Sequence, residues 1–145
     1  GLPPQALELE VTENIVLDDD VVLASLQRLR GLGIGIAFDD FGTGYASLSL
    51  LKRYPLSRIK IDRSFVMGMV QSDQDASVVR AIIDMARSFD LQTIAEGVET
   101  QEQLDNLRRL GCGQGQGYLL GKPMPAWEFG QTFGLDASWL NQKRA

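Results

Sequence analysis

The chain of 145 residues has the length of one ordinary domain, and 44% of its residues are hydrophobic, which is enough to form a core. Its 14 Lys and Arg residues against 19 Asp and Glu residues give a net charge of -5, which argues against nucleic-acid binding by bulk positive charge. There is no histidine, so Ser-His and Cys-His catalysis and zinc sites with histidine ligands are excluded.

The composition also limits the cofactor and the cellular setting. A metal bound without histidine needs oxygen ligands, which suit Mg²⁺, Mn²⁺ or Ca²⁺. The single cysteine, Cys112, cannot form an internal disulfide, so we expect a reducing, cytoplasmic setting. No apolar run approaches the ~18 residues of a membrane span, although a longer parent protein could be membrane-tethered.

Strand and helix patterns alternate along the first part of the chain, beginning with a strand at 6–11. An acidic first turn, Leu and Val at helical spacing and a glycine stop predict a helix over 18–33. The apolar run at 33–40 predicts a second strand. A short helix is expected at 47–54, and a third strand at 57–62.

The alternation continues through the second part of the chain. An amphipathic helix is predicted at 74–89, with its apolar residues on one side, followed by a strand at 91–97. A threonine cap opens the next predicted helix, at 100–111. A weak fifth strand, thinned by glycine, is expected at 113–121, and a further helix at 125–133.

Alternating strands and helices predict an α/β fold with a parallel sheet and right-handed connections. Two architectures fit this pattern: a five-stranded doubly wound sheet, or part of an eight-stranded barrel. The length favours the doubly wound sheet, because a barrel typically needs ~250 residues. The placement of the polar residues favours the barrel.

A charged or amide side chain lies at the carboxyl end of every predicted strand. In chain order these are Glu10, with Glu13 close by, then Asp39 and Asp40, Lys60 and Asp62, Glu96, with Glu99 close by, and Gln116. One carboxylate at a strand end is usually a helix N-cap, but five strands in succession form a pattern. In a barrel this edge holds an active site built from several strands, whereas an open sheet uses only its switch-point crevice.

The carboxylates at these strand ends would repel one another if they met without counter-ions, and one lysine cannot balance them. Two divalent cations ~3.5–4 Å apart could do so, and that arrangement is known for displacement at phosphorus. The adjacent residues Asp39 and Asp40 suit such a site, since one can bridge both ions while the other binds only one. The pattern therefore points to metal-assisted phosphoester hydrolysis.

Five segments of the sequence resemble the successive motifs of the EAL domain, the bacterial cyclic di-GMP phosphodiesterase. In order they are LEVTEN (9–14), DDFGTGYASL (39–48), IKIDRSFV (59–66), IAEGVET (94–100) and QGYLLGKPM (116–124). The resemblance implies the C-terminal portion of a TIM-like (β/α)8 barrel, with about five βα units. The whole chain, 1–145, would then be part of one EAL domain with no second domain.

The resemblance also implies an activity and a metal site. Members of the family use two Mg²⁺ or Mn²⁺ ions to hydrolyse one phosphodiester of cyclic di-GMP, giving linear pGpG. Glu10 resembles the ligand of the first metal, Asp39 the bridging aspartate, and Asp40 a ligand of the second metal. Asp62 and Glu96 resemble the residues around the second metal, and Glu96 is also a candidate general base.

The remaining strand-end residues take roles by the same resemblance. Lys60, expected to be catalytic with Glu96 and Asp62, is similar to the lysine whose charge stabilises the phosphorane. Gln116 resembles a glutamine that orders the water and metal shell, and Glu99 an acid on the substrate side. Glu13 resembles the glutamate that anchors the DFGTG loop, although this acid could simply open a helix, and Glu99 could cap one.

Two metal ligands of the family are absent from this chain: the Glu of the Glu-Ala-Leu motif and an asparagine on the following strands. We therefore expect the two-metal site to be incomplete and the chain alone, as a truncated or proteolysed part of the domain, to be inactive or nearly so. The resemblance further implies cyclic di-GMP as ligand, a homodimer through the EAL domain, and upstream sensory or GGDEF domains, but no nucleic acid.

A second interpretation is a non-catalytic EAL module that binds cyclic di-GMP or another protein, because many relatives keep the fold and lose metal ligands. Every ligand position visible in this chain is intact, which counts against this interpretation. If the upstream sequence lacked the Glu of the Glu-Ala-Leu motif, that would favour the non-catalytic interpretation.

A third interpretation is a phosphoacceptor receiver domain. Its support is the chain length, the acid pair, Asp62 after the third strand, and Lys122-Pro123 near the end. In a receiver domain, however, the acid pair should follow the first strand, whereas here it follows the second.

Overall fold

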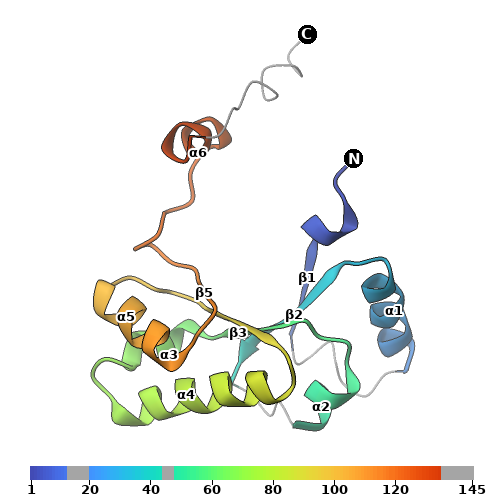
Figure 1. The fold of residues 1–145 in the computed structure, drawn as a ribbon, viewed down its shortest axis with the longest axis horizontal. Coiled ribbons are helices and arrows are strands. Elements are labelled where there is room, and N and C mark those ends of the chain that lie inside the picture. The colour runs from blue at the N-terminus through green and yellow to red at the C-terminus, as the bar shows by residue number, and fades with distance from the viewer. Residues whose placement is uncertain (13–19, 44–47, 135–145) are drawn as a thin grey trace.

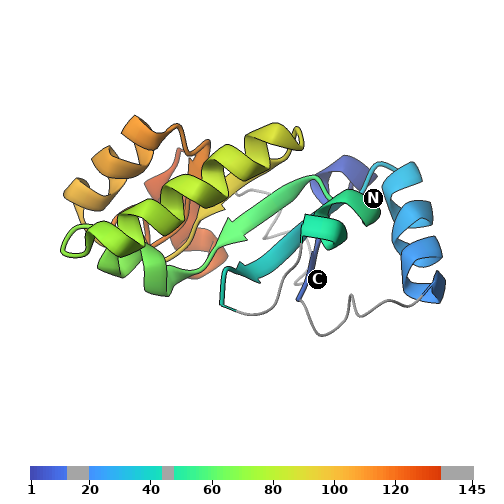
Figure 2. The same ribbon diagram turned by 90° about the horizontal axis from the view of Figure 1, so that it is seen from below.

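The computed structural model describes residues 1–12, 20–43 and 48–134. Five parallel strands form one sheet, with helices along one side of it (Figures 1 and 2). The strands are β1 (Glu8–Val11), β2 (Gly35–Phe41), β3 (Arg58–Ile61), β4 (Gln92–Ala95) and β5 (Gln114–Gly115).

The strands lie in the sheet in the order β1-β2-β3-β4-β5, and each is parallel to its neighbours. A doubly wound sheet reverses direction at a switch point, so its strands are out of sequence order. The sequential order observed here is that of a barrel wall, in which every connection advances in the same direction. It therefore excludes the doubly wound architecture and the receiver-domain interpretation.

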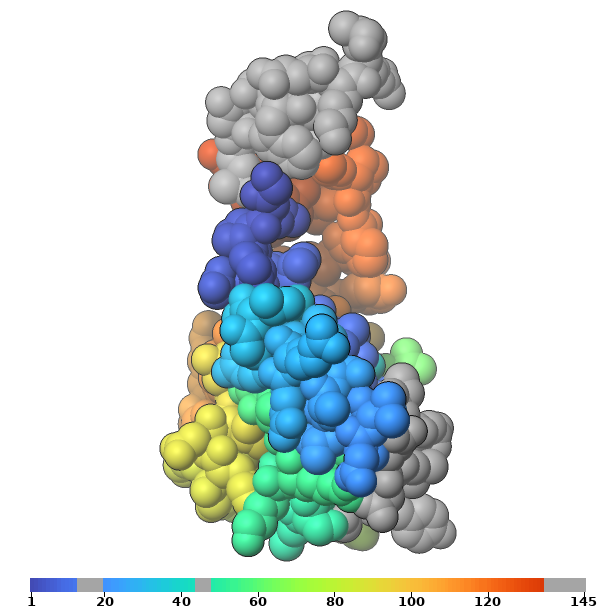
Figure 3. Space-filling model, turned by 90° about the vertical axis from the view of Figure 1, so that its right-hand side faces the viewer, coloured from blue at the N-terminus to red at the C-terminus, as the bar shows by residue number. Residues whose placement is uncertain are grey.

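The helical segments follow the predicted alternation. They are η1 (Pro4–Ala6), α1 (Asp20–Gly31), α2 (Leu48–Arg53), α3 (Arg63–Gly68), α4 (Asp73–Ser88), α5 (Gln101–Leu110) and α6 (Ala126–Thr132). Helix α6 stands away from the sheet at the end of an extended segment (Figure 1). Seen from the side, α1 and α2 lie at the front of the body, and the described residues after β5 rise above it (Figure 3). Within the described residues, no helix is both long and apolar enough to cross a membrane.

The core lies between the sheet and the helices. Alternate strand residues supply one side of it: Ile36, Phe38, Ile59, Ile61 and Ala95, each at most 1% exposed. The predicted amphipathic helix α4 supplies much of the other side, with buried Val79, Ile82, Ile83 and Ala86. Because strand side chains alternate between faces, the residues between these core positions lie on the opposite face, which carries the polar groups.

Two short helical segments were not predicted, and all five strands are shorter than expected, β5 most of all. Helix α3 has six residues, too few for a helical period to show in the sequence. The Pro3-Pro4 pair begins the short helix η1, so the first strand begins at Glu8. The glycine-rich fifth strand is reduced to Gln114 and Gly115.

Candidate metal centre

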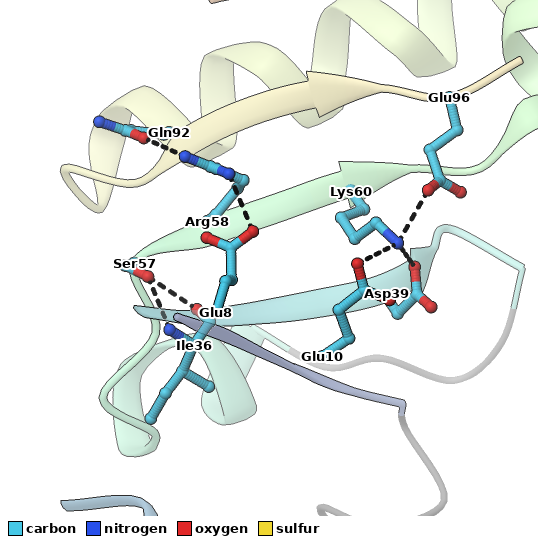
Figure 4. Close-up of polar contacts among 9 residues, drawn as sticks. All are labelled: Glu8, Glu10, Ile36, Asp39, Ser57, Arg58, Lys60, Gln92 and Glu96. Atoms are coloured by element: carbon cyan, nitrogen blue, oxygen red, sulfur yellow. Dashed lines mark hydrogen bonds and ion pairs between the residues drawn. The ribbon is translucent and has the colours of Figure 1, made fainter. Parts of the chain in front are cut away.

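A buried lysine lies at the centre of the polar face of the sheet (Figure 4). Lys60 on β3 is 6% exposed, and its Nζ lies 2.8 Å from an oxygen of each of three carboxylates. Glu10 comes from β1, Asp39 from β2, and Glu96 from the residue directly after β4. Four successive strands therefore bring their carboxyl ends to one ammonium group, as the strand-end pattern predicted.

Burial alone would lower the pKa of Lys60, because a low-dielectric surrounding disfavours the ammonium. Its close contacts with Asp39, Glu10 and Glu96 outweigh that cost and raise the pKa above its ordinary value. Lys60 is therefore a fixed positive charge over the whole working pH range. It offsets only one of the three negative charges that surround it.

The acid pair is arranged by a break in strand β2. Consecutive strand residues normally point to opposite faces, which would separate Asp39 from Asp40. Here the register against β3 shifts between Phe38 and Phe41, and Asp40 has φ 53°, in the left-handed region. As a result, carboxylate oxygens of Asp39, Asp40 and Glu96 all lie within 4.8 Å of one another.

The pKa of Asp40 is raised above its ordinary value. Partial burial is the largest cause, followed by repulsion from Asp39 and Asp62. The positive charges of Lys60 and Arg63 oppose this effect without cancelling it.

Asp62 caps the start of helix α3. Its Oδ1 accepts hydrogen bonds from the backbone N–H of Ser64, at 2.9 Å, and from the Ser64 hydroxyl. Burial would raise the pKa of Asp62, but the bonds from Ser64 outweigh it and lower the pKa. Asp62 is thus close enough to repel Asp40 electrostatically but stands outside the three-carboxylate group, so its metal and catalytic roles stay predictions.

Glu99 and Gln116, two further predicted site residues, are both exposed. The N–H of Glu99 donates to Gln103 Oε1 at 2.8 Å, beside the capping box that Thr100 and Gln103 form at the start of α5, and Glu99 is exposed. Gln116 is exposed too, and its carbonyl accepts from the N–H of Val98 at 3.0 Å, beside the loop that carries Glu99. Glu13 lies outside the described residues, so its role as a loop anchor stays a prediction.

A close backbone approach, which the sequence did not predict, holds the loop after β4. A Cβ atom added to Gly117 would lie 2.2 Å from the carbonyl oxygen of Val98 and 2.3 Å from its nitrogen. The neighbouring N–H of Leu119 donates to that same carbonyl at 3.0 Å. Only glycine allows this approach, which anchors the loop two residues after Glu96. The only sequence signal was an unexplained glycine in a predicted strand.

The donor atoms of this site fit a divalent cation. Oδ1 of Asp39 is shielded from solvent and pairs with Lys60 Nζ at 2.8 Å. A carboxylate has two oxygens with about four lone pairs, so this ion pair leaves Asp39 able to bind a metal ion as well. Asp40 and Glu96 add further oxygens within 4.8 Å, and hard cations such as Mg²⁺ and Mn²⁺ prefer such ligands.

Comparison with known proteins identifies the family. The family model of the EAL domain matches residues 1–123. MucR of Pseudomonas aeruginosa, named a bifunctional diguanylate cyclase/cyclic di-GMP phosphodiesterase, is 50% identical over 127 residues. That match covers 87% of this chain and 18% of MucR, so the chain spans less than a fifth of this relative.

Solved structures agree with the sequence match. The structure of the MucR phosphodiesterase in complex with c-di-GMP superposes with a TM-score of 0.83 at 49% identity, covering 88% of this chain and 52% of that one. BlrP1 of Klebsiella pneumoniae, in a manganese and cyclic di-GMP complex, gives a TM-score of 0.74 at 35% identity, covering 81% and 30%. The expected fold class, the C-terminal portion of a TIM-like barrel with about five βα units, is confirmed, and the chain belongs to the EAL-domain family.

Proposed function

We propose that this chain carries the metal-binding face of a cyclic di-GMP phosphodiesterase, which hydrolyses one phosphodiester to give linear pGpG and so lowers cyclic di-GMP signalling. The observation that carries the proposal is the meeting of Lys60 with Glu10, Asp39 and Glu96 at the carboxyl ends of the strands, 2.8 Å from each. Membership of the EAL family and the names of MucR and BlrP1 support the choice of substrate.

In this proposal Asp39, Asp40 and Glu96 would hold divalent cations, Mg²⁺ or Mn²⁺, with Glu10 and Asp62 as further ligands. When bound, such ions polarise a phosphoryl oxygen and lower the pKa of a coordinated water. The chain lacks the Glu-Ala-Leu motif and the asparagine that complete the family's ligand set. The two-metal site is therefore incomplete in this chain.

The chain's own residues would position the substrate and move a proton. The permanently charged Lys60 would stabilise the negative charge that develops on the phosphate oxygens, where a pre-placed charge is most effective. Glu96 would accept the proton of the attacking water as general base. Glu99 and Gln116, both exposed, are free to contact the substrate or its water shell.

The wider setting belongs to the same proposal. The chain would be the C-terminal part of one EAL domain, preceded in the whole protein by sensory or GGDEF domains and dimerising through the EAL domain. The name of MucR, which joins a cyclase to a phosphodiesterase, supports the idea of further domains. We also propose a cytoplasmic site of action, where cyclic di-GMP is available.

The test uses a chimera. We would place the part of the MucR EAL domain that precedes the aligned region ahead of Gly1, and follow pGpG formation from cyclic di-GMP by chromatography with Mg²⁺ or Mn²⁺. We expect turnover by the chimera and none at an ordinary enzymatic rate by residues 1–145 alone. Asp39→Asn in the chimera should abolish turnover while circular dichroism shows a folded protein.

Three outcomes would count against the proposal. A folded chimera that binds cyclic di-GMP without hydrolysing it would favour the non-catalytic binding module. Turnover that survives Asp39→Asn would show that the carboxylate site is not the catalytic one. Ordinary activity of residues 1–145 alone would contradict the incomplete metal site.

A further inference from the structure

A second polar layer lies on the same face of the sheet, two residues before the Lys60 layer on β1 and β3 and four residues before it on β4 (Figure 4). On β3, Arg58 Nη1 donates to Glu8 Oε1 of β1 at 2.8 Å, and Nη2 donates to Gln92 Oε1 of β4 at 2.8 Å. Glu8 precedes Glu10 by two residues, as Arg58 precedes Lys60. We call Arg58, Glu8 and Gln92 the arginine layer.

Small residues on β2 leave room for the side chains of Glu8 and Arg58 to meet above that strand. In register, Gly35 of β2 pairs with Glu8 and Ala37 pairs with Arg58. These two residues are the smallest available, so side chains from β1 and β3 can meet above β2. A Cβ atom on Gly35 would come within 3.2 Å of Glu8 Oε2, which is tighter than ordinary contact.

Within the arginine layer, the Arg58–Glu8 pair is more buried than the other ion pairs of the described residues that involve arginine. The side chains of Arg58 and Glu8 are 20% and 31% exposed, against 67% and 55% for the surface pair Arg108 and Asp105, whose atoms are 3.8 Å apart. Charge-assisted hydrogen bonds of this length are strong when solvent is partly excluded. The Nε of Arg58 is shielded and unpaired, so this guanidinium is held through its two Nη groups.

The arginine layer links strand β1 to strand β3. Among the described residues, β1 pairs with β2 alone, and Glu8, Leu9 and Glu10 are all exposed. The ladder fixes β1 beside β2, but it does not reach β3. The Arg58–Glu8 bond joins β1 to β3 directly, two residues before the point where Glu10 must reach Lys60.

We propose that Arg58 is a positioning residue for the Lys60 layer. By holding Glu8 and Gln92 on one guanidinium, it sets β1 and β4 against β3, so that Glu10 and Glu96 both reach Lys60. Arg58 itself touches none of the proposed metal ligands. Its relevance to catalysis rests on the proposed function, whereas the coupling between the two layers does not.

The first experiment measures that coupling without any metal. Urea unfolding of the full chain, of its Glu10→Gln and Lys60→Met variants, and of the double variant gives the coupling free energy between Glu10 and Lys60. The same measurements are then repeated in chains that also carry Arg58→Met. We expect Arg58→Met to remove about half of the coupling or more. Arg108→Met, which breaks a surface pair, is the matched control and should leave the coupling unchanged. An unchanged coupling with Arg58→Met would overturn the proposal.

Conservative variants separate positioning from charge. Arg58→Lys keeps the positive charge but cannot reach both partners with a rigid fork, so it should lose the coupling as Arg58→Met does. An unchanged Glu10–Lys60 coupling in Arg58→Lys would show that the positive charge alone suffices. It would overturn the proposal that Arg58 acts by holding both Glu8 and Gln92. Arg58→Lys also serves in place of Arg58→Met if the latter does not fold.

Mn²⁺ binding by the chain, followed by electron paramagnetic resonance, distinguishes this inference from the proposed function. Asp39→Asn tests the metal site, and Arg58→Met tests the positioning, with an expected loss of about tenfold in affinity. If Arg58 acts only by positioning Glu10 and Glu96, adding Arg58→Met to a chain that already carries Glu10→Gln and Glu96→Gln should not weaken Mn²⁺ binding further. If Arg58→Met instead disturbs the structure in general, it would weaken Mn²⁺ binding in that chain too. If Asp39→Asn binds Mn²⁺ like the wild type, the metal site fails while the unfolding data still decide the role of Arg58.

Discussion

At the scale of single residues, the site is dominated by one buried positive charge among several negative ones. A buried ammonium is tolerated only when it is paired, and Lys60 has three partners at 2.8 Å. The remaining negative charge makes the site attractive to a divalent cation. Partial burial, followed by repulsion from the neighbouring carboxylates, raises the pKa of Asp40.

Lys60→Met should destabilise the chain markedly. It removes the ammonium while keeping the length of the side chain, and it leaves Glu10, Asp39 and Glu96 facing one another. Because these carboxylates are partly exposed, we expect a loss of about 2–4 kcal/mol in unfolding free energy at neutral pH. Lys52→Met, at an exposed position on α2, is the control, and an equal cost for both variants would contradict the pairing.

Asp40→Asn should stabilise the metal-free chain at neutral pH. The pKa of Asp40 is raised in the folded state, so this group favours folding at low pH, and that contribution is lost as the pH rises through its folded pKa. Removing the charge should therefore stabilise at pH 7, by less than about 1 kcal/mol because Asp40 is exposed. Asn also tolerates the left-handed backbone at φ 53°. Thermal unfolding at pH 7 and pH 3 checks this, and destabilisation at pH 7 would contradict it.

At the scale of elements, the regular strands bring the functional groups to the same edge of the sheet. Irregular backbone at and after the strand ends then sets their exact positions. The bulge in β2 turns Asp39 and Asp40 toward one site, and the N-cap of α3 uses the Asp62 carboxylate. The loop after β4 is held by the approach of Gly117 to Val98. Each of these features lies at a strand end, where the ladder stops dictating the backbone.

Gly117→Ala tests the loop after β4. A new Cβ atom would lie 2.2 Å from the carbonyl oxygen of Val98, which is backbone and cannot yield cheaply. We expect a loss of about 2 kcal/mol or more in unfolding free energy. Gly113→Ala is the matched control, because its Cβ would be 3.6 Å from the nearest atom. Equal stability of the two variants in urea would refute the close approach.

At the scale of the whole molecule, the sheet separates an apolar side from a polar side. Helices cover the apolar face, and the opposite face presents the arginine layer and the Lys60 layer (Figures 1 and 4). Beyond β5, a cavity of about 880 Å³ is lined by Ile94, Gln116, Tyr118 and Phe129 among others. The carboxyl edge of the sheet therefore combines a charged centre with an adjoining apolar hollow, next to Gln116.

Divalent metal should stabilise the folded chain as a whole. A ligand that binds only the folded state adds about 2.7 kcal/mol at a hundredfold excess over its Kd. We expect Mn²⁺ to raise Tm with concentration, and chelation by EDTA to reverse the shift. Asp39→Asn should remove the response, whereas Asp84→Asn, on the exposed side of α4, should retain it. The same metal response in Asp39→Asn as in the wild type would exclude this group as the binding site.

The sequence by itself determined the order of the five strands and of the helices other than η1 and α3, the apolar face of α4 and the polar residue at each strand end, because these follow from local periodicity. It also carried the family motifs. Only the tertiary structure decided the sequential strand order, since that depends on pairing between distant segments. It also decided the bulge at Asp40, the contact of Gly117 with Val98, and the tie of Arg58 to Glu8 across the small residues of β2. These are contacts between residues far apart in the chain or local departures from regular geometry, and neither has a periodic signature.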